Sequence, residues 1–534
     1  MLRKTTLFIL CMAAAFSIMI TGWIYLISKD YKSNGVDTME PVQKQFSASG
    51  IWQAPANPHS TEAVYAEKYR PQYHYSPKEG WLNDPNGLVY YEGEYHLFYQ
   101  NHPYSKQWGP MHWGHAVSED LLHWEELPIA MYPDELGMIF SGSVVVDWQD
   151  TSGFFNGSSG LTAIFTHHTE EGQAQSVAYS KNKGRTWTKY EGNPVLPNFG
   201  EEGFRDPKVF WHEPTQRWVM IVAGGKVRFY SSSNLKQWAL MSENDIWTEC
   251  PDFFELAVDG NPEKKKWVLN LGGREYIIGQ FDGERFIPET AALPLNYGPD
   301  SYAAQTFSDM PEADGRRVMI NWMMNWEYAA ALGDVTDPWN GAMTIPHELS
   351  LRTYFEGIRL VQSPVKELRS LRKQHARFEN EDIAENSNLL DAIHGGLLEL
   401  VAEIELDTAA EFGFKVRQGD GEKTVIGYDV SNGELFVDRS SAGKVVTGKF
   451  SAPLYPENKR VKMQIFIDSS SVEVFGNEGK GIITSLIFPD PASDKLEIYA
   501  NNGNVRLVSL DIYELKPVWD IAGTKQADTA MEEQ

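Results

Sequence analysis

The sequence predicts an all-β protein: a five-bladed β-propeller over residues 68–360, followed by a β-sandwich over residues 390–516. Three observations support this prediction. Between residues 68 and about 350 the chain consists of short apolar runs separated by turn residues, without a convincing amphipathic helix. Five of these runs recur at about the length of a propeller blade. Beyond residue 390, eight runs alternate polar and apolar side chains, which is typical of antiparallel strands.

The propeller repeat is visible in apolar runs of similar composition. The five runs are YHLFYQ (95–100), LTAIFT (161–166), WVMIVA (218–223), WVLNLG (267–272) and VMINWM (318–323). Their starts are 66, 57, 49 and 51 residues apart, close to the length of a four-stranded blade. Four of the units continue into a polar turn that ends in an aromatic residue: Trp124, Trp187, Trp238 and Phe286. An irregular β-sandwich would explain the strands but not this period.

A further strand precedes each of these runs, and its polar start supplies candidate functional residues. In a propeller the first strand of every blade lines the central channel, so matching ends of these strands face one funnel. The polar starts are Asn83-Asp84, Ser141-Gly142-Ser143, Arg205-Asp206, Glu249 and Asp300-Ser301. The repeat therefore predicts that Asp84, Asp206 and Glu249 converge on one pocket from the first, third and fourth blades.

Asp84 lies in the predicted tight turn of WLNDPNG (81–87). Pro85 fixes its own φ and favours extended geometry at Asp84, while Asn86-Gly87 tolerates positive φ. The apolar runs that follow predict a hairpin. An isolated Asp-Pro of this kind would be a turn that caps a strand, but the acids that recur in phase with it favour a functional role.

Composition narrows the range of partners. The formal net charge of −26 argues against nucleic acid and anionic membrane surfaces. The 17 Trp, 24 Tyr and 26 Phe residues suffice for a large core and for side chains that stack on sugars. Because the two cysteines are Cys11, in an apolar N-terminal segment, and Cys250, no disulfide is expected in the folded part, and Cys250 is interpreted as a small buried side chain. The sequence carries no metal or cofactor motif, and we expect neither to be required.

Carboxylates that converge on an aromatic-lined funnel indicate nucleophilic or acid–base catalysis. Glycoside hydrolysis needs such a set: one carboxylate attacks the sugar or activates water, and another, with a raised pKa, protonates the leaving oxygen. A separation of roughly 5–5.5 Å between the two carboxylates gives retention of configuration, and a wider one inversion. For Glu249, desolvation and the nearby Asp252 are expected to raise the pKa.

At these residues the chain resembles glycoside hydrolase family 32, the β-fructofuranosidases, which include invertases, inulinases and levanases. WLNDPNG (81–87) is similar to the family's nucleophile motif, with Leu82 where Met is common. FRDP (204–207) and EC (249–250) are similar to its other two acidic motifs. Further similar segments are HWGHAVSEDLLHW (112–124), FSGS (140–143), NW (325–326) and VEVF (472–475). The resemblance covers the chain after about residue 70.

The resemblance implies a role for each of the three acids. Asp84 would be the nucleophile that forms a covalent fructosyl-enzyme, and Glu249 would be the general acid and then the general base. Asp206 would hold sugar hydroxyls and stabilise the oxocarbenium-like transition state. A furanose ring also needs hydrogen-bonding groups and aromatic walls around it. The side chains expected to bind substrate are Trp81, Asn83, Gln100, Trp108, Phe140, Ser141, Arg205, Asp300 and Trp326.

Structural alternatives stay open for four of these substrate-binding residues. Arg205 could form a purely structural ion pair with Asp206. Trp108 and Trp326 could belong to the apolar core, since propellers bury many aromatic side chains. Asp300 could cap a turn instead of facing the channel.

Together these features predict a retaining β-fructosidase that hydrolyses terminal fructosyl linkages of levan, inulin or sucrose. A fructosyltransferase on the same site is the alternative enzyme, with a sugar hydroxyl replacing water. A non-catalytic fructan-binding protein at the cell surface is the third alternative, against which the presence of all three acids argues.

The ends of the chain predict its location. Arg3 and Lys4 precede an apolar segment from Leu7 to about Ile27, long enough to span a bilayer. We expect residues 1–28 to be an uncleaved signal anchor with the rest of the chain outside the cell; cleavage and secretion are the alternative. The remaining segments are interpreted as a tether (29–67), a linker that holds a short helix (361–389) and a tail (517–534).

Overall fold

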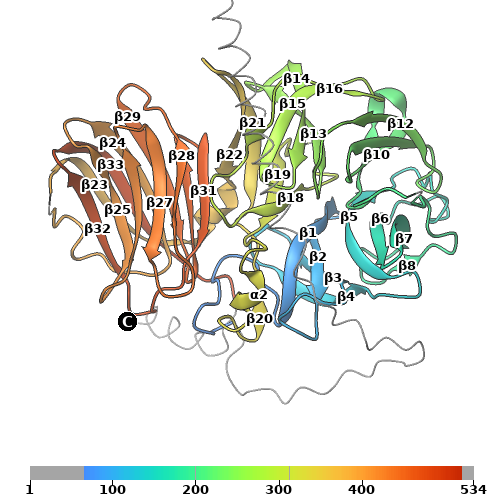
Figure 1. The fold of residues 1–534 in the computed structure, drawn as a ribbon, viewed down its shortest axis with the longest axis horizontal. Coiled ribbons are helices and arrows are strands. Elements are labelled where there is room, and N and C mark those ends of the chain that lie inside the picture. Colours follow the sequence, from blue (N-terminus) through green and yellow to red (C-terminus); the bar gives the residue numbers. More distant parts are fainter. Residues whose placement is uncertain (1–64, 199, 312, 386, 520–534) are drawn as a thin grey trace, which may run out of the picture. The chain divides into compact units, whose positions relative to one another are not determined.

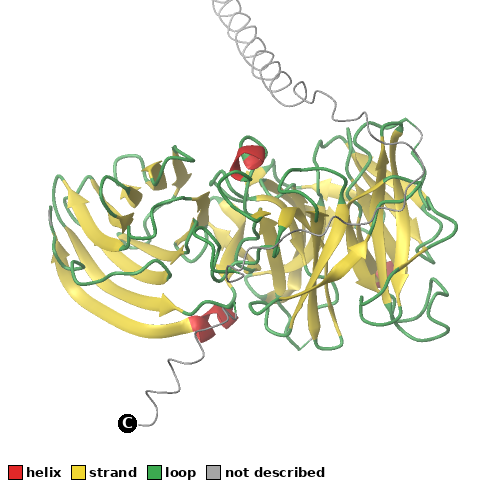
Figure 2. Cartoon of the chain, turned by 90° about the horizontal axis from the view of Figure 1, so that it is seen from below, coloured by secondary structure: helices red, strands yellow, loops and turns green. Residues whose placement is uncertain are grey.

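Residues 65–519, except 199, 312 and 386, are described by the structure, which is a computed structural model. The predicted anchor (1–28) lies outside the described residues, as do most of the predicted tether (29–67) and most of the predicted tail (517–534). Strands make up nearly all the regular structure of the described part (Figure 2). No helix within it is long and apolar enough to cross a membrane.

The predicted five-bladed propeller is confirmed (Figure 1). Blade one contains β1 (Gly80–Tyr91), β2 (Glu94–His102), β3 (His112–Ser118) and β4 (Glu125–Met131), and β20 (Trp339–Asn340) pairs with β1. Blade two contains β5 (Met138–Val146), β6 (Leu161–Thr169), β7 (Gly172–Ser180) and β8 (Thr188–Lys189). Blade three contains β9 (Lys208–His212), β10 (Arg217–Val222), β11 (Val227–Ser232) and β12 (Ala239–Asn244), with the 3₁₀ turn η1 (Glu213–Thr215) between its first two strands.

Blades four and five share one sheet, because β13 and β21 are bridged at Val258 and Leu351. Blade four contains β13 (Asp252–Val258), β14 (Asn261–Leu271), β15 (Glu275–Phe281), β16 (Phe286–Pro288) and β17 (Leu293–Pro294). Blade five contains β18 (Tyr302–Thr306), β19 (Arg317–Trp322), β21 (His347–Tyr354) and β22 (Gly357–Pro364). The short helix α2 (Ala329–Leu332) lies between β19 and β20.

The periodic apolar runs correspond to the second strand of every blade, namely β2, β6, β10, β14 and β19. These strands are apolar because both of their faces pack against a neighbouring blade. Phe98 of β2 and Val144 of β5 belong to a core between blades one and two, and Phe229 and Phe253 to a core between blades three and four. The central channel is surrounded by the first strand of each blade, namely β1, β5, β9, β13 and β18 (Figure 1).

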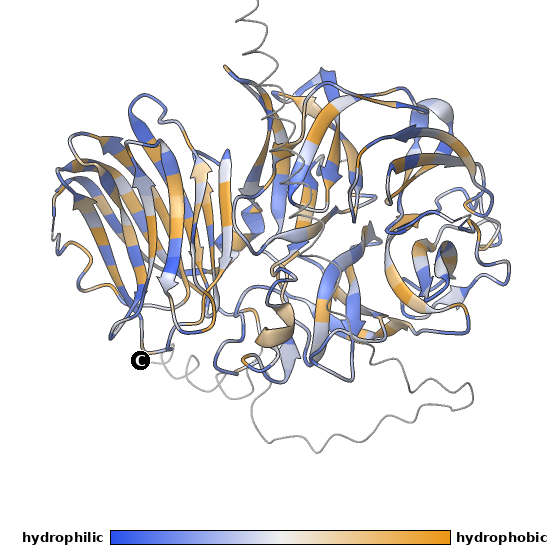
Figure 3. Cartoon of the chain, viewed as in Figure 1, coloured by the Kyte–Doolittle hydropathy of each residue, from blue (hydrophilic) through white to orange (hydrophobic). Residues whose placement is uncertain are grey.

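Two antiparallel sheets form the C-terminal β-sandwich. One contains β23 (Arg372–Ile383), β33 (Val505–Leu515), β24 (Leu398–Leu406), β29 (Arg460–Ile467), β30 (Ser471–Gly476) and β31 (Gly481–Leu486). The other contains β28 (Lys449–Pro453), β27 (Glu434–Ser441), β26 (Lys423–Asp429), β25 (Glu411–Gln418) and β32 (Lys495–Asn501). Hydropathy alternates along these strands (Figure 3), and their apolar faces enclose a single buried core.

The segment 361–389 is not a simple linker. It holds the end of β22, the 3₁₀ helix η2 (Lys366–Leu371) and the whole of β23, which pairs with β33 along the sandwich. The sandwich therefore begins near residue 372 and not at residue 390. Period-two analysis missed β23 because it is an edge strand, and edge strands carry charged residues such as Arg377 and Glu379 that hide the apolar alternation.

A buried ionic network joins the start of the propeller to the sandwich. His74 Nδ1 lies 2.7 Å from Asp468 Oδ2, and its Nε2 lies 2.9 Å from Glu473 Oε1. His347 on β21 approaches the second oxygen of Glu473 at 3.4 Å. Burial alone would lower the pKa of His74, but its hydrogen bonds to the two carboxylates raise it to about 9. His74 is therefore positively charged at neutral pH, and this charge compensates the two buried carboxylates.

Replacing His74 with Leu should lower the free energy of unfolding by about 3 kcal/mol at pH 7, because two buried carboxylates lose their counter-charge. The folded pKa of about 9 exceeds the usual 6.5, so this stabilisation is fully present below pH 6.5 and is lost as the pH rises through about 9. Urea unfolding at pH 7 and pH 10 checks this. His123→Leu, which breaks an exposed pair with Asp120, should change little. A His74 effect of equal size at both pH values would contradict the charge assignment.

Candidate active site

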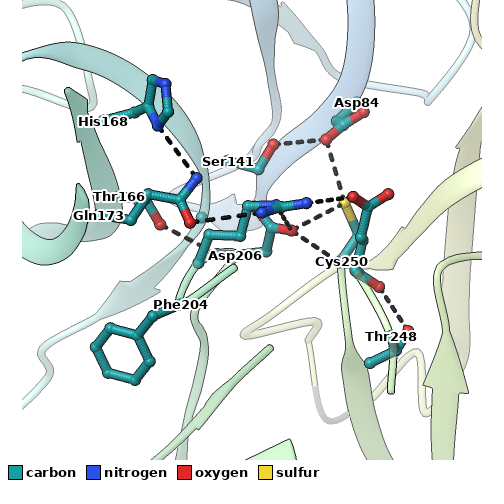
Figure 4. A network of polar contacts seen from close by, with 12 residues as sticks. Asp84, Ser141, Thr166, His168, Gln173, Phe204, Asp206, Thr248 and Cys250 are labelled. Atoms are coloured by element: carbon teal, nitrogen blue, oxygen red, sulfur yellow. Dashed lines mark hydrogen bonds and ion pairs between the residues drawn. The ribbon is translucent and has the colours of Figure 1, made fainter. Parts of the chain in front are cut away.

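Asp84, Asp206 and Glu249 meet at one end of the central channel. Asp84 lies on β1, Asp206 lies two residues before β9, and Glu249 lies three residues before β13. The thiol of Cys250 links two of them, with Sγ 3.2 Å from Asp84 Oδ2 and 3.6 Å from Asp206 Oδ2 (Figure 4). An arginine links the other pair, because Arg205 bonds to Glu249 and its Nε lies 3.6 Å from Asp206 Oδ2. Blades one, three and four thus each contribute one carboxylate to a single cluster.

Asp84 is held by neighbours that donate hydrogen bonds to both of its oxygens. Asn83 Nδ2 donates to Oδ1 at 2.9 Å, and Ser141 Oγ donates to Oδ2 at 2.6 Å. Asn83 is itself oriented by Trp81 Nε1, which donates to its amide oxygen at 2.7 Å. The β1–β2 register shifts on both sides of Pro85, and these irregularities interrupt the ladder at the acid. These hydrogen bonds hold the Asp84 carboxylate in one orientation.

Asp206 is the most enclosed of the three acids. Its backbone has a φ of 59°, in the left-handed region, and its N–H donates to Thr166 Oγ1 at 3.0 Å. Its carboxylate accepts the backbone N–H of Cys250 at 2.9 Å. Burial raises the pKa of Asp206 to about 7; the charge of Arg205 opposes this rise and that of Asp84 adds to it. Ionisation of Asp206 therefore lowers the stability of the folded protein.

Asp206→Asn should raise the free energy of unfolding by about 2 kcal/mol at pH 8. The folded pKa of about 7 lies above the ordinary 3.8, so the folded chain binds this proton more tightly than the unfolded chain. Stability therefore falls as the pH rises from about 4 to about 7, and Asn removes this loss. Urea unfolding of both proteins at pH 4 and pH 8 checks the prediction. A variant less stable than the parent at pH 8 would contradict it.

Glu249 is the most exposed of the three acids, with 26% of its side chain accessible. Arg205 bonds to one of its oxygens and the Tyr302 hydroxyl donates to the other. Asp252, which was expected to act on Glu249, is bonded to other groups. That carboxylate is fully buried, lies 3.0 Å from Lys208 Nζ and accepts the backbone N–H groups of Phe253 and Thr306. Tyr302 and Arg205, not Asp252, set the surroundings of Glu249.

Aromatic and amide side chains from blades one, two and five surround the cluster. Trp326 is 47% exposed and stacks on buried Trp81, with ring centroids 5.9 Å apart. Phe140 stacks on His168 at 4.2 Å, and Trp108 approaches Phe140 edge-on at 6.3 Å. Trp81 is linked to Asp84 through Asn83, so the accessible ring of Trp326 lies beside the acids, where it can stack on a sugar.

Two amide side chains complete the polar part of the site. Gln173 joins His168 to Arg205 through contacts of 3.2 and 3.4 Å (Figure 4). Gln100 is buried and donates to the backbone oxygen of Ile139 at 3.0 Å. The site therefore offers several hydrogen-bonding groups between its aromatic faces.

Comparison with known proteins agrees with this arrangement of fold and acids. Residues 74–364 match the N-terminal domain of glycosyl hydrolases family 32, and residues 366–514 match the C-terminal domain of the same family. The chain belongs to glycosyl hydrolase family 32. Its match to the family covers both the propeller and the sandwich, so the fold and the family assignment rest on the whole described part of the chain.

Similar family 32 proteins come from bacteria and fungi. The levanase of Bacillus subtilis (strain 168) is 52% identical over 490 residues, which is 86% of this chain and 72% of that protein. The levanase of Bacillus sp. (strain L7) is 41% identical over 88% of this chain, which spans about half, 54%, of that relative. Among solved structures, the exo-inulinase of Aspergillus awamori has a TM-score of 0.79 and 35% identity over 85% of this chain and 100% of its own. The fructofuranosidase of Schwanniomyces occidentalis complexed with fructose has a TM-score of 0.76 and 30% identity over 86% of this chain and 100% of its own.

Asp300, expected among the substrate-binding residues, is buried away from solvent. Its side chain is fully buried, and its carboxylate accepts hydrogen bonds from Arg439 Nη1 at 2.7 Å and the Leu486 backbone N–H at 2.8 Å. Asn325 and Tyr328 occupy its other oxygen. All its acceptor capacity is used inside the fold, where it ties the propeller to the sandwich. Asp300 therefore has neither of the two expected roles, as a turn cap or as a residue at the channel mouth.

Two polar side chains that contact the acid cluster were missed by the sequence analysis. Tyr302 opens the first strand of blade five, two residues after Asp300, so the blade period indicated the right place but the wrong side chain. Gln173 opens the second half of a hairpin in blade two, where no motif marks it. Cys250 was interpreted as a small buried side chain, yet it contacts two carboxylates. Burial and the charge of Asp206 raise its pKa well above the ordinary value, so the thiol stays protonated.

Proposed function

We propose that this chain is a retaining β-fructosidase that removes terminal fructosyl units from fructans and sucrose. The observation that carries the proposal is the meeting of Asp84, Asp206 and Glu249 at one end of the channel, in a chain of glycosyl hydrolase family 32. Levanases and exo-inulinases among its relatives support fructans as the substrate class.

Two displacements at the anomeric carbon make up the proposed reaction. Asp84 Oδ attacks that carbon as Glu249 gives its proton to the departing oxygen, so the glycosidic bond breaks with its electron pair on the leaving alcohol. Water then attacks the fructosyl–Asp84 ester, Glu249 takes the water proton, and fructose leaves with Asp84 restored as a carboxylate. The hydrogen bonds from Asn83 and Ser141 support the nucleophile role, because they hold the Asp84 carboxylate in one orientation.

The remaining polar groups have supporting roles in this proposal. Glu249 is the most accessible acid, which suits a group that must meet the leaving oxygen and then water. Arg205 and Tyr302 hold its two oxygens and thereby orient the carboxyl group. Asp206, beside Arg205, would accept sugar hydroxyls and stabilise positive charge on the ring in the transition state. The face of Trp326 would stack on the sugar, with Trp81 behind it.

Product analysis on levan, inulin and sucrose tests the proposed activity. We expect free fructose as the first product from a fructan, and none from the Asp84→Ala variant. A fructosyltransferase would instead release glucose from sucrose faster than fructose and build longer oligosaccharides. A purely fructan-binding protein would bind levan without releasing any sugar. Either result would replace hydrolysis as the function.

We propose that the enzyme acts outside the cell, held there by residues 1–28. The apolar segment from Leu7 to Ile27, preceded by Arg3 and Lys4, supports this, and relatives described as extracellular exo-inulinases support the location. Deleting residues 1–28 should move the activity from washed membranes to the soluble fraction. If the full chain is already found free in the medium with a new N-terminus, the segment is a cleaved signal peptide.

A further inference from the structure

A second cavity lies at the end of the propeller channel opposite to the acids. It has a volume of about 500 Å³ and is lined by residues of blades two to five. Asp206 precedes β9, whereas the cavity is lined by Lys208, Phe210 and His212 along that strand. Six residues of extended chain span roughly 20 Å, so the two sites lie at different ends of the channel. A volume of this size is typical of small-molecule sites.

Lys208, one of the residues that line this rear cavity, belongs to a buried ion pair. Lys208 Nζ lies 3.0 Å from Asp252 Oδ1 and donates to the backbone oxygen of Thr306 at 2.8 Å. Both charged side chains are almost completely buried. The Lys208 ammonium is thus occupied by partners within the fold, which leaves ligand recognition to the other lining side chains.

Two accessible tryptophans near the mouth are held in place by carboxylates. Trp148 is 58% exposed, and its Nε1 donates to Asp309 Oδ1 at 2.9 Å. Asp309 is fixed in turn, because its Oδ2 accepts the backbone N–H of Val146 at 2.9 Å. Trp211 is half-buried, and its Nε1 donates to Glu213 Oε2 at 2.7 Å. Indole rings fixed in this way lose little conformational freedom when a ligand stacks on them.

The charge of the rear cavity argues for a neutral ligand. Its lining includes the acids Asp147, Glu213, Glu255 and Asp309, more than its cations. Lys208 is already paired, which disfavours an anion. The positive charge of Arg317 disfavours a cation. Its guanidinium lies 5.5 Å from the centre of the Phe254 ring, and its Nη1 donates to the Phe307 backbone oxygen at 3.1 Å. Aromatic faces, carboxylates and a guanidinium in one cavity are the groups that bind a sugar's C–H faces and hydroxyls.

We propose that the rear cavity is a second, non-catalytic sugar-binding site that holds a fructosyl segment of a fructan chain. The identity of this sugar rests on the proposed function of the acid site. Stacking on Trp148 and Trp211, with hydroxyls bonded to Glu213 and Arg317, would keep the enzyme on its polymer between cleavage events. A small substrate that occupies only the acid site would not bind more tightly because of the rear cavity.

Calorimetric titration with a β-2,6-linked fructose trisaccharide tests the proposal directly. In the full chain carrying Asp84→Asn, which stops turnover, we expect two binding events per molecule. Adding Trp148→Ala and Trp211→Ala should abolish one event and leave the other unchanged. Tyr455→Ala, which removes an equally exposed aromatic from the sandwich, is the matched control and should retain both. A single event before the tryptophans are replaced, or two events afterwards, overturns the proposal.

Kinetics separate this proposal from the function of the acid site. With Asp84 intact, the double tryptophan variant should keep its kcat/KM on sucrose, while its KM on levan rises about tenfold. An equal KM on levan in the parent and the variant would overturn a role for the rear site in holding polymer. If the parent cleaves no fructan at all, the proposed function fails, whereas the number of binding events still reports on the rear cavity alone.

Discussion

Asp84→Asn is expected to lower kcat on sucrose and levan by about 10⁴-fold or more, because it removes the nucleophile but preserves the shape of the turn. The amide keeps one oxygen that can accept the hydrogen bond of Ser141, so the fold and the binding of fructose should survive. Initial rates of fructose release, together with the thermal unfolding temperature of both proteins, measure the effect.

Azide provides the control for this first variant. In Asp84→Ala the small anion can enter the vacated space and attack the sugar directly, so activity should return with a fructosyl azide of inverted configuration. Ser141→Ala is the matched neighbour variant, because it removes one hydrogen bond from the carboxylate but not the nucleophile, and it should cost far less. An Asp84→Ala enzyme that keeps more than about a tenth of its kcat would exclude the covalent role.

Glu249→Ala should lower kcat on sucrose by about 10³-fold but spare a fructoside with a good leaving group, such as p-nitrophenyl β-fructofuranoside, in the first step. A good leaving group departs without protonation, so the general acid is not needed there. Burst kinetics on the activated fructoside and initial rates on sucrose measure the two effects.

Tyr302→Phe is the matched companion of the second variant. It removes one hydrogen bond from Glu249 and retains the ring, so it should lower kcat on sucrose far less than Glu249→Ala does. Equal losses on sucrose and on the activated fructoside in Glu249→Ala would remove Glu249 from the role of proton donor.

The sequence predicted the architecture well because the propeller repeats itself. Strands such as β6 and β10 are buried on both faces, so their apolar runs stand out and reveal the period. The strand β23 was missed for the opposite reason. It lies at an edge of its sheet and carries charges, so nothing in its composition distinguishes it from a linker.

Only those residues of the candidate site that lie at equivalent positions of the repeated blades could be predicted. Asp84 and Asp206 occupy equivalent starts of first strands, so their meeting followed from the period. Asp300 occupies a similar start, but its surroundings depend on Arg439, which lies far along the chain in the sandwich. No local pattern reports such a partner. The same holds for Tyr302, whose contact with Glu249 depends on how two blades pack.

Trapping the fructosyl-enzyme tests the central claim most directly. Glu249→Ala, incubated with an activated fructoside and quenched in acid, should accumulate the covalent species because the second step lacks its general base. Peptide mapping by mass spectrometry is then expected to find one fructosyl residue on the peptide that contains Asp84. A fructosyl group on the Asp206 peptide, or steady turnover with no labelled peptide, would contradict the account.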